Sequence, residues 1–120
     1  QYELPGLFAP IADFTLLETA VAVAREMGVE MPVGNLLSSD TFYDASNSTM
    51  KWAEMGVLAV EMEAAALYMT AAKLGKRALA ICSISDSIVT GEALPASDRQ
   101  TTFTTMMKIA LETAVKMAGK

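Results

Sequence analysis

The feature that most constrains the fold is an apolar run over residues 78–84, which has the length of a single strand. The run shows no alternation between apolar and polar positions, so both faces of the strand would be buried. Strands of this kind occur in parallel sheets that helices cover on each side. The run therefore predicts an interior strand of a parallel sheet in an α/β protein.

Helical and strand-like patterns alternate along the rest of the chain. Helices are predicted over 15–27, 49–55 and 64–74, with a long one opening at Ser97, and further strands over 31–38 and 57–60. Capping-box spacing marks two of the helix starts, and the pairs are Thr15 with Glu18 and Ser97 with Gln100. This alternation predicts layers of helices around a mainly parallel sheet.

Two apolar stripes are expected to face the core. The first helix presents Phe14, Leu17, Val21 and Ala24 at helical spacing, and the last helix presents Phe103, Met106, Ala110, Ala114 and Met117. The single cysteine, Cys82, lies inside the predicted interior strand and is expected to be a small core residue.

Three strands make a thin sheet whose edges would be exposed, so we expect other strands to be supplied from elsewhere. The sequence opens at Gln1 rather than at methionine, and we therefore expect the 120 residues to be less than the whole translated product. Residues 1–120 are then interpreted as part of one domain.

Composition excludes several classes of function. Nine Lys and Arg against fourteen Asp and Glu give a net charge of -5, which argues against binding to the phosphate backbone of nucleic acid. The apolar stretches are too short for a transmembrane helix. One cysteine allows no disulfide framework, which favours a cytoplasmic location. The absence of histidine removes Ser-His-Asp and Cys-His nucleophile systems and imidazole zinc sites.

Polar residues follow two of the predicted strands. Glu61, Met62 and Glu63 come after the strand over 57–60, and Ser85 and Asp86 come after the run over 78–84. Ligands of open α/β sheets bind at the carboxyl ends of strands, so these residues would share one crevice. The alternative is that Glu61 and Glu63 only open the next helix, where acids favour the helix dipole, and that Ser85 and Asp86 form an ordinary turn.

Three motifs carry a resemblance to a known family: Val-Glu-Met-Glu-Ala-Ala over 60–65, Ser-Asp at 85–86, and Arg-Gln-Thr-Thr-Phe over 99–103. Together with Phe-Ala-Pro-Ile-Ala-Asp-Phe over 8–14, Val-Gly-Asn-Leu over 33–36 and Phe-Tyr at 42–43, they resemble the bacterial, hexameric type of purine nucleoside phosphorylase. The first motif is shared across the wider phosphorylase and nucleosidase superfamily. The Arg-Gln-Thr-Thr-Phe segment, thirteen residues after Asp86, points to the purine phosphorylase branch.

The resemblance implies phosphorolysis of purine nucleosides to a free base and ribose 1-phosphate. It implies that Asp86 is the general acid that protonates N7 of the purine and that Arg99 stabilises the resulting carboxylate. The same resemblance places Phe42, Glu61, Met62, Glu63 and Ser85 in the substrate site, with Phe42 against purine and ribose and Glu63 accepting bonds from the sugar hydroxyls. A general acid of this kind contributes on the order of 10²–10⁴-fold to the rate.

The resemblance also implies a three-layer αβα nucleoside phosphorylase-like fold of which this chain is the C-terminal half. The phosphate site would lie in the missing N-terminal half, so the chain alone is expected to be inactive. Phosphate is then the co-substrate, no metal or other cofactor is expected, and the partners are the missing half and further copies in a hexamer. Many relatives carry histidine where this chain has Ser87.

Two alternatives remain open at this point. A hydrolytic nucleosidase of the same superfamily, of the methylthioadenosine or adenosylhomocysteine type, shares the Val-Glu-Met-Glu and Ser-Asp elements but uses water in place of phosphate. The chain could also be an assembly module with no activity of its own.

Overall fold

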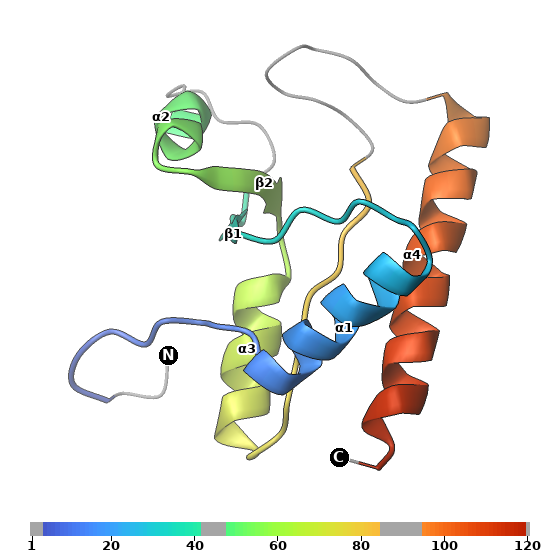
Figure 1. The fold of residues 1–120 in the computed structure, drawn as a ribbon. Coiled ribbons are helices and arrows are strands. Elements are labelled where there is room, and N and C mark those ends of the chain that lie inside the picture. The colour runs from blue at the N-terminus through green and yellow to red at the C-terminus, as the bar shows by residue number, and fades with distance from the viewer. Residues whose placement is uncertain (1–3, 42–47, 85–94, 120) are drawn as a thin grey trace.

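A computed structural model describes residues 4–41, 48–84 and 95–119 of the chain. In these segments the order of elements is α1 (Phe14–Glu26), β1 (Asn35–Ser38), α2 (Ser48–Glu54), β2 (Val57–Glu61), α3 (Ala64–Lys73) and α4 (Ala96–Met117). Figure 1 shows the two strands at the top of α3, with α1 lying across α4 on the other side of the molecule. The predicted helices and the first two strands are therefore present, with bounds shifted by one to several residues.

Strands β1 and β2 form a parallel pair, which confirms the predicted strand direction. Leu37 lies opposite Val60, and Ser38 lies opposite Glu61. The first strand begins at Asn35 and is shorter than the predicted 31–38. A Cβ at Gly34, just before β1, would lie 2.7 Å from Cδ1 of Leu58, so a larger residue there would displace the Leu58 side chain.

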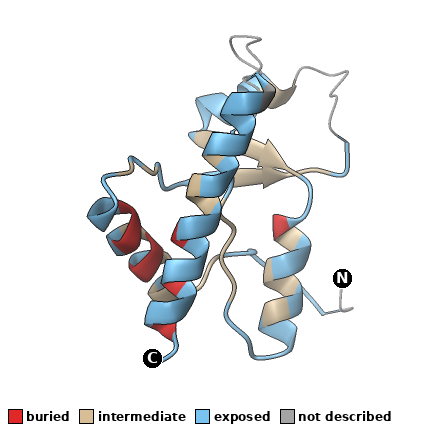
Figure 2. Cartoon of the chain, turned by 90° about the vertical axis from the view of Figure 1, so that its right-hand side faces the viewer, coloured by how far each residue is buried: buried red, intermediate tan, exposed pale blue. Residues whose placement is uncertain are grey.

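The core lies between α1 and α4, which Figure 2 shows as the two helices with buried faces turned toward one another. Val23 and Ala24 of α1 pack against Ile109 of α4, and Val29, Met31 and Ile81 surround them. Beyond the core, Nζ of Lys116 lies 2.9 Å from Oε2 of Glu26 and joins the ends of the two helices. The two helices therefore hold together segments that are far apart in the sequence.

The predicted apolar stripes are only partly correct. The buried residues are Thr19, Ala20, Val23 and Ala24 on α1 and Ile109, Thr113 and Met117 on α4, whereas Phe14 and Phe103 are mostly exposed. Threonine can occupy a buried face here because its hydroxyl is satisfied inside its own helix. Thr19 Oγ1 donates to Thr15 O at 2.7 Å, and Thr113 Oγ1 donates to Ile109 O at 2.6 Å. Small and β-hydroxyl side chains then let the helices approach closely.

Neither predicted capping box forms. Asp13 is the N-cap of α1, and its Oδ2 accepts a bond from Leu16 N at 2.9 Å, so Thr15 lies within the helix. Helix α4 begins at Ala96 after Pro95, with no capping bond from a side chain, and Ser97 lies in its first turn. The fixed φ of Pro95 opens this helix without a hydroxyl cap.

The expectation of a paired interior strand over 78–84 is wrong within the described residues, where this segment joins no ladder. The segment runs between α3 and the α1–α4 pair (Figure 1), but none of its residues is buried, and Cys82 and Ile84 are exposed. Ala80 N donates to Tyr68 Oη of α3 at 2.8 Å, while Ile81 packs on the α1–α4 core. Ala78 O accepts a bond from Asp13 N at 3.0 Å. These contacts, in place of strand partners, hold the segment against α1, α3 and α4.

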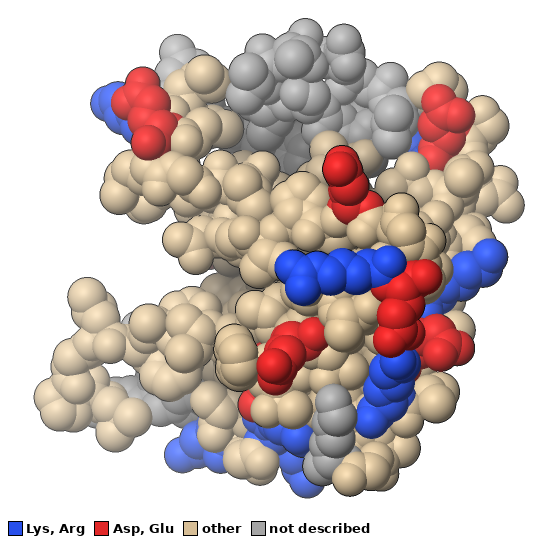
Figure 3. Space-filling model, viewed as in Figure 1, with Lys and Arg blue, Asp and Glu red and all other residues tan. Residues whose placement is uncertain are grey.

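The segment before α1 projects from the body of the molecule, and Figure 3 shows a notch between it and the part that carries α2. Its large apolar side chains are exposed, with Leu7 at 97% the most open. The others are Leu4, Phe8 and Ile11. None of the helices in the described residues has the length and apolar character needed to cross a membrane.

Candidate active site

The carboxyl end of β2 is organised by the side chain of Glu61. Its Oε2 accepts two short bonds, one from Glu63 N and one from Ala64 N, each at 2.6 Å. Its main-chain oxygen accepts a bond from Ser39 N at 2.9 Å, which extends the parallel pairing past β1. Glu61 therefore joins the ends of both strands to the first residue of α3.

A second strand residue completes the start of α3. Ser38 Oγ, at the end of β1, accepts a bond from Ala65 N at 3.2 Å. The backbone N–H groups of Glu63, Ala64 and Ala65 are thus satisfied by side chains from the two strands. The helix needs such partners, because the N–H groups of a first turn have none within the helix.

Glu63 and Met62 differ from Glu61 in being exposed, Met62 at 42%. Glu63 occupies the N-cap position of α3 but makes no capping bond with its side chain. Glu61 thus opens the helix, as the alternative expects, whereas the Glu63 side chain makes no capping bond. The Glu63 carboxylate stands at a strand end with its oxygens directed to no group of the helix start.

The charges of Glu61 and Glu63 at the end of β2 act on a residue of segment 78–84. The pKa of the Cys82 thiol is raised by desolvation, because neighbouring atoms partly cover its sulfur although the residue as a whole is exposed, and to a lesser degree by the negative charges of Glu61 and Glu63. Cys82 itself is exposed, and the expectation of a core residue is wrong because no strand neighbour covers it in the described residues.

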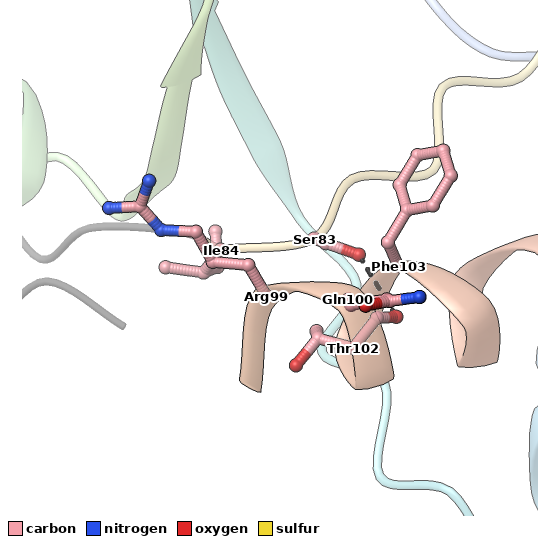
Figure 4. Close-up of a pocket in the computed structure, with 6 residues that line it drawn as sticks. All are labelled: Ser83, Ile84, Arg99, Gln100, Thr102 and Phe103. Atoms are coloured by element: carbon pink, nitrogen blue, oxygen red, sulfur yellow. Dashed lines mark hydrogen bonds between the residues drawn. The ribbon is translucent and has the colours of Figure 1, made fainter. Parts of the chain in front are cut away.

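Arg99 lines an open pocket of about 360 Å³ between the end of segment 78–84 and the start of α4. The lining is formed by Ser83, Ile84, Arg99, Gln100, Thr102 and Phe103. Ser83 Oγ donates to Thr102 O at 3.2 Å and fixes the segment to the helix. Figure 4 shows the Arg99 side chain extending past Ile84, away from the Phe103 ring. Arg99 thus lies next to the residue that precedes Ser85.

Phe42, Ser85 and Asp86 lie outside the described residues, so the structure places only Glu61, Met62, Glu63 and Arg99 of the predicted site. Sequence reasoning assigned no role to Ser38, although its hydroxyl holds the start of α3. It assigned Gln100 to a capping box and Phe103 to the core, whereas both line the pocket with Arg99. The Arg-Gln-Thr-Thr-Phe motif contained both pocket residues, whereas no sequence signal marked Ser38.

A second pocket, of about 420 Å³, lies between α1 and residues 29–33. Val21, Ala24 and Arg25 of α1 contribute to its wall, and none of the predicted site residues does. The residues that the motifs single out therefore belong to the strand ends and to the start of α4.

Comparison with known proteins identifies the family. Residues 2–118 match the model of a family described as the phosphorylase superfamily. The chain belongs to the phosphorylase superfamily. The Val-Glu-Met-Glu-Ala-Ala motif and the strand-end position of Glu61 and Glu63 are thus features of a superfamily member.

Similar curated proteins are named purine nucleoside phosphorylase DeoD-type. One from Caldanaerobacter subterraneus subsp. tengcongensis is 57% identical over 108 residues, covering 89% of this chain and 47% of the relative. One from Geobacillus sp. is 50% identical over 110 residues, covering 92% of this chain and 47% of the relative. The chain therefore spans about half the length of these relatives, and the resemblance that its motifs carry is confirmed.

A solved structure gives the fold independently. The structure described as the P. knowlesi homolog of P. falciparum PNP is 27% identical and aligns with a TM-score of 0.76, covering 93% of this chain and 46% of that one. The chain is therefore an α/β protein with a nucleoside phosphorylase-like fold, as expected from the alternation of its helices and strands.

Proposed function

We propose that this chain supplies the base and ribose part of a purine nucleoside phosphorylase, which converts a purine nucleoside and phosphate to a free base and ribose 1-phosphate. The observation that carries the proposal is the identity of 50–57% with DeoD-type purine nucleoside phosphorylases over about nine tenths of the chain. The site supports it, because an exposed carboxylate and a guanidinium flank the ends of β2 and segment 78–84.

The sugar is proposed to bind at the end of β2. Glu63 has an exposed carboxylate, which is an acceptor for two hydroxyl groups and offsets positive charge that develops on ribose. Met62 is exposed beside it and provides an apolar contact. Phe42 and Ser85 are proposed to complete the pocket around the nucleoside, with Phe42 against the purine and ribose.

The leaving base is proposed to be protonated at N7 by Asp86. Burial of a carboxyl group keeps its proton in place at neutral pH, as a general acid requires. Arg99 then stabilises the carboxylate that remains, which favours the transition state over the bound substrate. The position of Arg99 beside Ile84, two residues before Asp86, supports this pairing.

The phosphate site is proposed to lie in a segment that the DeoD-type relatives have and this chain does not match, since the chain covers 47% of their length. The exposed apolar side chains of residues 4–14 and the outer face of α4 support binding to such a segment. On α4 these side chains are Phe103, Met107, Leu111 and Val115. We further propose a cytoplasmic enzyme of purine salvage that assembles as a hexamer, with no metal and no cofactor beyond phosphate.

The test is a cleavage assay on a complex of this chain with the part of the Geobacillus sp. relative outside the match, the two being co-expressed. The complex is expected to release hypoxanthine from inosine only when phosphate is present, with ribose 1-phosphate as the second product. The chain alone is expected to release none.

Release of free ribose without phosphate would replace this proposal by a hydrolytic nucleosidase. A stable complex that cleaves no purine nucleoside would instead leave the chain as an assembly module.

A further inference from the structure

The two glutamates of the Val-Glu-Met-Glu motif are held very differently. Oε2 of Glu61 is engaged by two backbone N–H groups at 2.6 Å each, whereas the Glu63 side chain makes no bond to the helix start. Hydrogen bonds to an ionised oxygen are short and about twice as strong as neutral ones. Oε2 of Glu61 is therefore occupied by bonds within the chain, whereas the Glu63 side chain makes no such bond to the helix start.

The position of Glu63 depends on these bonds. Glu63 lies in the two-residue turn between β2 and α3, and one of the groups that Glu61 binds is the N–H of Glu63 itself. The next N–H, that of Ala64, is bound by the same oxygen. One carboxylate thus holds the backbone N–H groups of Glu63 and of the residue after it, so the backbone that carries the Glu63 side chain depends on Glu61.

The remaining oxygen of Glu61 is not open to a ligand. Oε1 is buried and has no hydrogen-bond partner among the described residues. An acceptor withdrawn from solvent in this way is poorly placed to bind a sugar hydroxyl that enters from outside. The geometry therefore separates the roles of two acids that sit two residues apart.

We propose that Glu61 is a positioning residue, which orients Glu63 toward the ribose through the two N–H bonds and does not itself contact the sugar. The inference rests on the proposed function, in which Glu63 binds the sugar hydroxyls. Glu61 then acts on the substrate only through Glu63, and the group that Glu63 binds is the vicinal diol of the ribose.

The role predicts a difference between two substitutions of Glu61. Glu61→Gln keeps a side-chain oxygen that accepts both N–H bonds, while Glu61→Ala removes the acceptor. In the co-expressed complex, Glu61→Ala is expected to lower kcat/KM for inosine about 10²-fold, the usual cost of misplacing a contact by about 1 Å, and Glu61→Gln much less. Glu112→Gln, an exposed acid on α4, is the matched control and is expected to match the wild type.

Two readouts separate positioning from a general loss of structure. With 2′-deoxyinosine, which lacks one hydroxyl, the loss caused by Glu61→Ala is expected to be smaller than with inosine, whereas a folding defect lowers both equally. In a Glu63→Ala background, Glu61→Ala is expected to add no more than about twofold, within the scatter of independent cycles.

The inference is overturned if Glu61→Gln loses as much activity as Glu61→Ala, or if the losses of Glu61→Ala and Glu63→Ala multiply. If Glu61→Ala does not fold, Glu61→Gln alone decides, because near wild-type kcat/KM for inosine supports positioning and a large loss refutes it. A wild-type complex that does not cleave inosine would refute the proposed function and this inference with it. An active wild type with a crippled Glu61→Gln would refute the inference alone.

Discussion

The side of the molecule where α1 packs on α4 is closed, and the side where β1, β2 and α3 meet is open. Of the described buried residues, all but Ala64 belong to α1 or α4. The open side carries the strand ends with Glu61, Met62 and Glu63, and the apolar Leu58 and Leu67 remain half exposed there. The comparison shows that the helix pair is held mainly by packing, while short polar bonds from strand residues hold the site.

The largest expected effect is on the closed side. Ile109 is 3% exposed, and Ile109→Ala is expected to lower the free energy of unfolding by about 2–5 kcal/mol, from lost burial and the cavity left behind. Leu67→Ala on α3 is expected to cost less, because that side chain is 45% exposed. Urea denaturation followed by circular dichroism measures both. Equal losses would show that α3 is packed as tightly as α4 and would break the comparison.

The next effect concerns how helices begin. Asp13→Ala removes the Oδ2 acceptor for Leu16 N and is expected to cost about 0.5–2 kcal/mol. Ser97→Ala at the start of α4 is expected to stay within about 0.5 kcal/mol of wild type, because the helix start there has no capping bond from a side chain. The same denaturation experiment applies. A larger loss from Ser97→Ala would show that Ser97 caps α4 after all, as the sequence predicts.

The reactivity of the Cys82 thiol tests the arrangement of charges on the open side. Burial, with the charges of Glu61 and Glu63, raises the pKa of the Cys82 thiol, so its alkylation by iodoacetamide is expected to accelerate at higher pH than that of free cysteine. Glu63→Gln is expected to shift the midpoint of the rate profile downward, and Glu112→Gln to leave it in place. A profile unchanged by Glu63→Gln would mean that the Glu63 charge does not reach the Cys82 thiol.

The raised pKa of Cys82 also predicts how the stability of the fold changes with pH. The folded state favours the neutral thiol, so its contribution is complete below the pKa of the unfolded chain and is lost as the pH rises through the folded pKa. Cys82→Ser is therefore expected to remove a small alkaline decline in stability, measured as the dependence of the urea midpoint on pH.

The smallest effect is expected for the ion pair between Lys116 and Glu26. Both side chains are substantially exposed, so Lys116→Gln is expected to cost about 0.2–1 kcal/mol in dilute buffer. The difference from wild type is expected to vanish in about 1 M salt, where charges are screened beyond about 3 Å. A loss that persists in high salt would mean that Lys116 contributes by packing its aliphatic stem rather than by charge.

Local signals in the sequence were sufficient for the helices. Gly28, with a φ of +70°, follows α1 as predicted, and α2 and α3 begin within one residue of their expected starts. These features depend on neighbours a few residues away. The buried faces were harder to predict, because Thr19 and Thr113 look polar and become compatible with a core only when their hydroxyls bond to carbonyls of their own helices.

Long-range features were the least predictable. The apolar pattern of residues 78–84 predicts burial on both sides but does not say which groups bond to its backbone. One of these groups is the Tyr68 hydroxyl, which accepts a bond from Ala80 N. In the site, the motifs identified Glu61 and Glu63 as a pair, yet only the structure separates the acid that holds α3 from the exposed one. Two neighbouring carboxylates give the same sequence signal whichever of them the protein uses internally.

The most direct test of the central claim, that this chain carries the acid and sugar contacts of purine nucleoside phosphorolysis, is Asp86→Asn in the co-expressed complex. Asparagine keeps the shape of the side chain but cannot donate an acidic proton. Cleavage of inosine is expected to fall by about 10²–10⁴-fold, the usual contribution of a general acid. Cleavage of 7-methylguanosine, whose purine already carries a positive charge, is expected to fall far less. Equal losses for the two nucleosides would contradict the account.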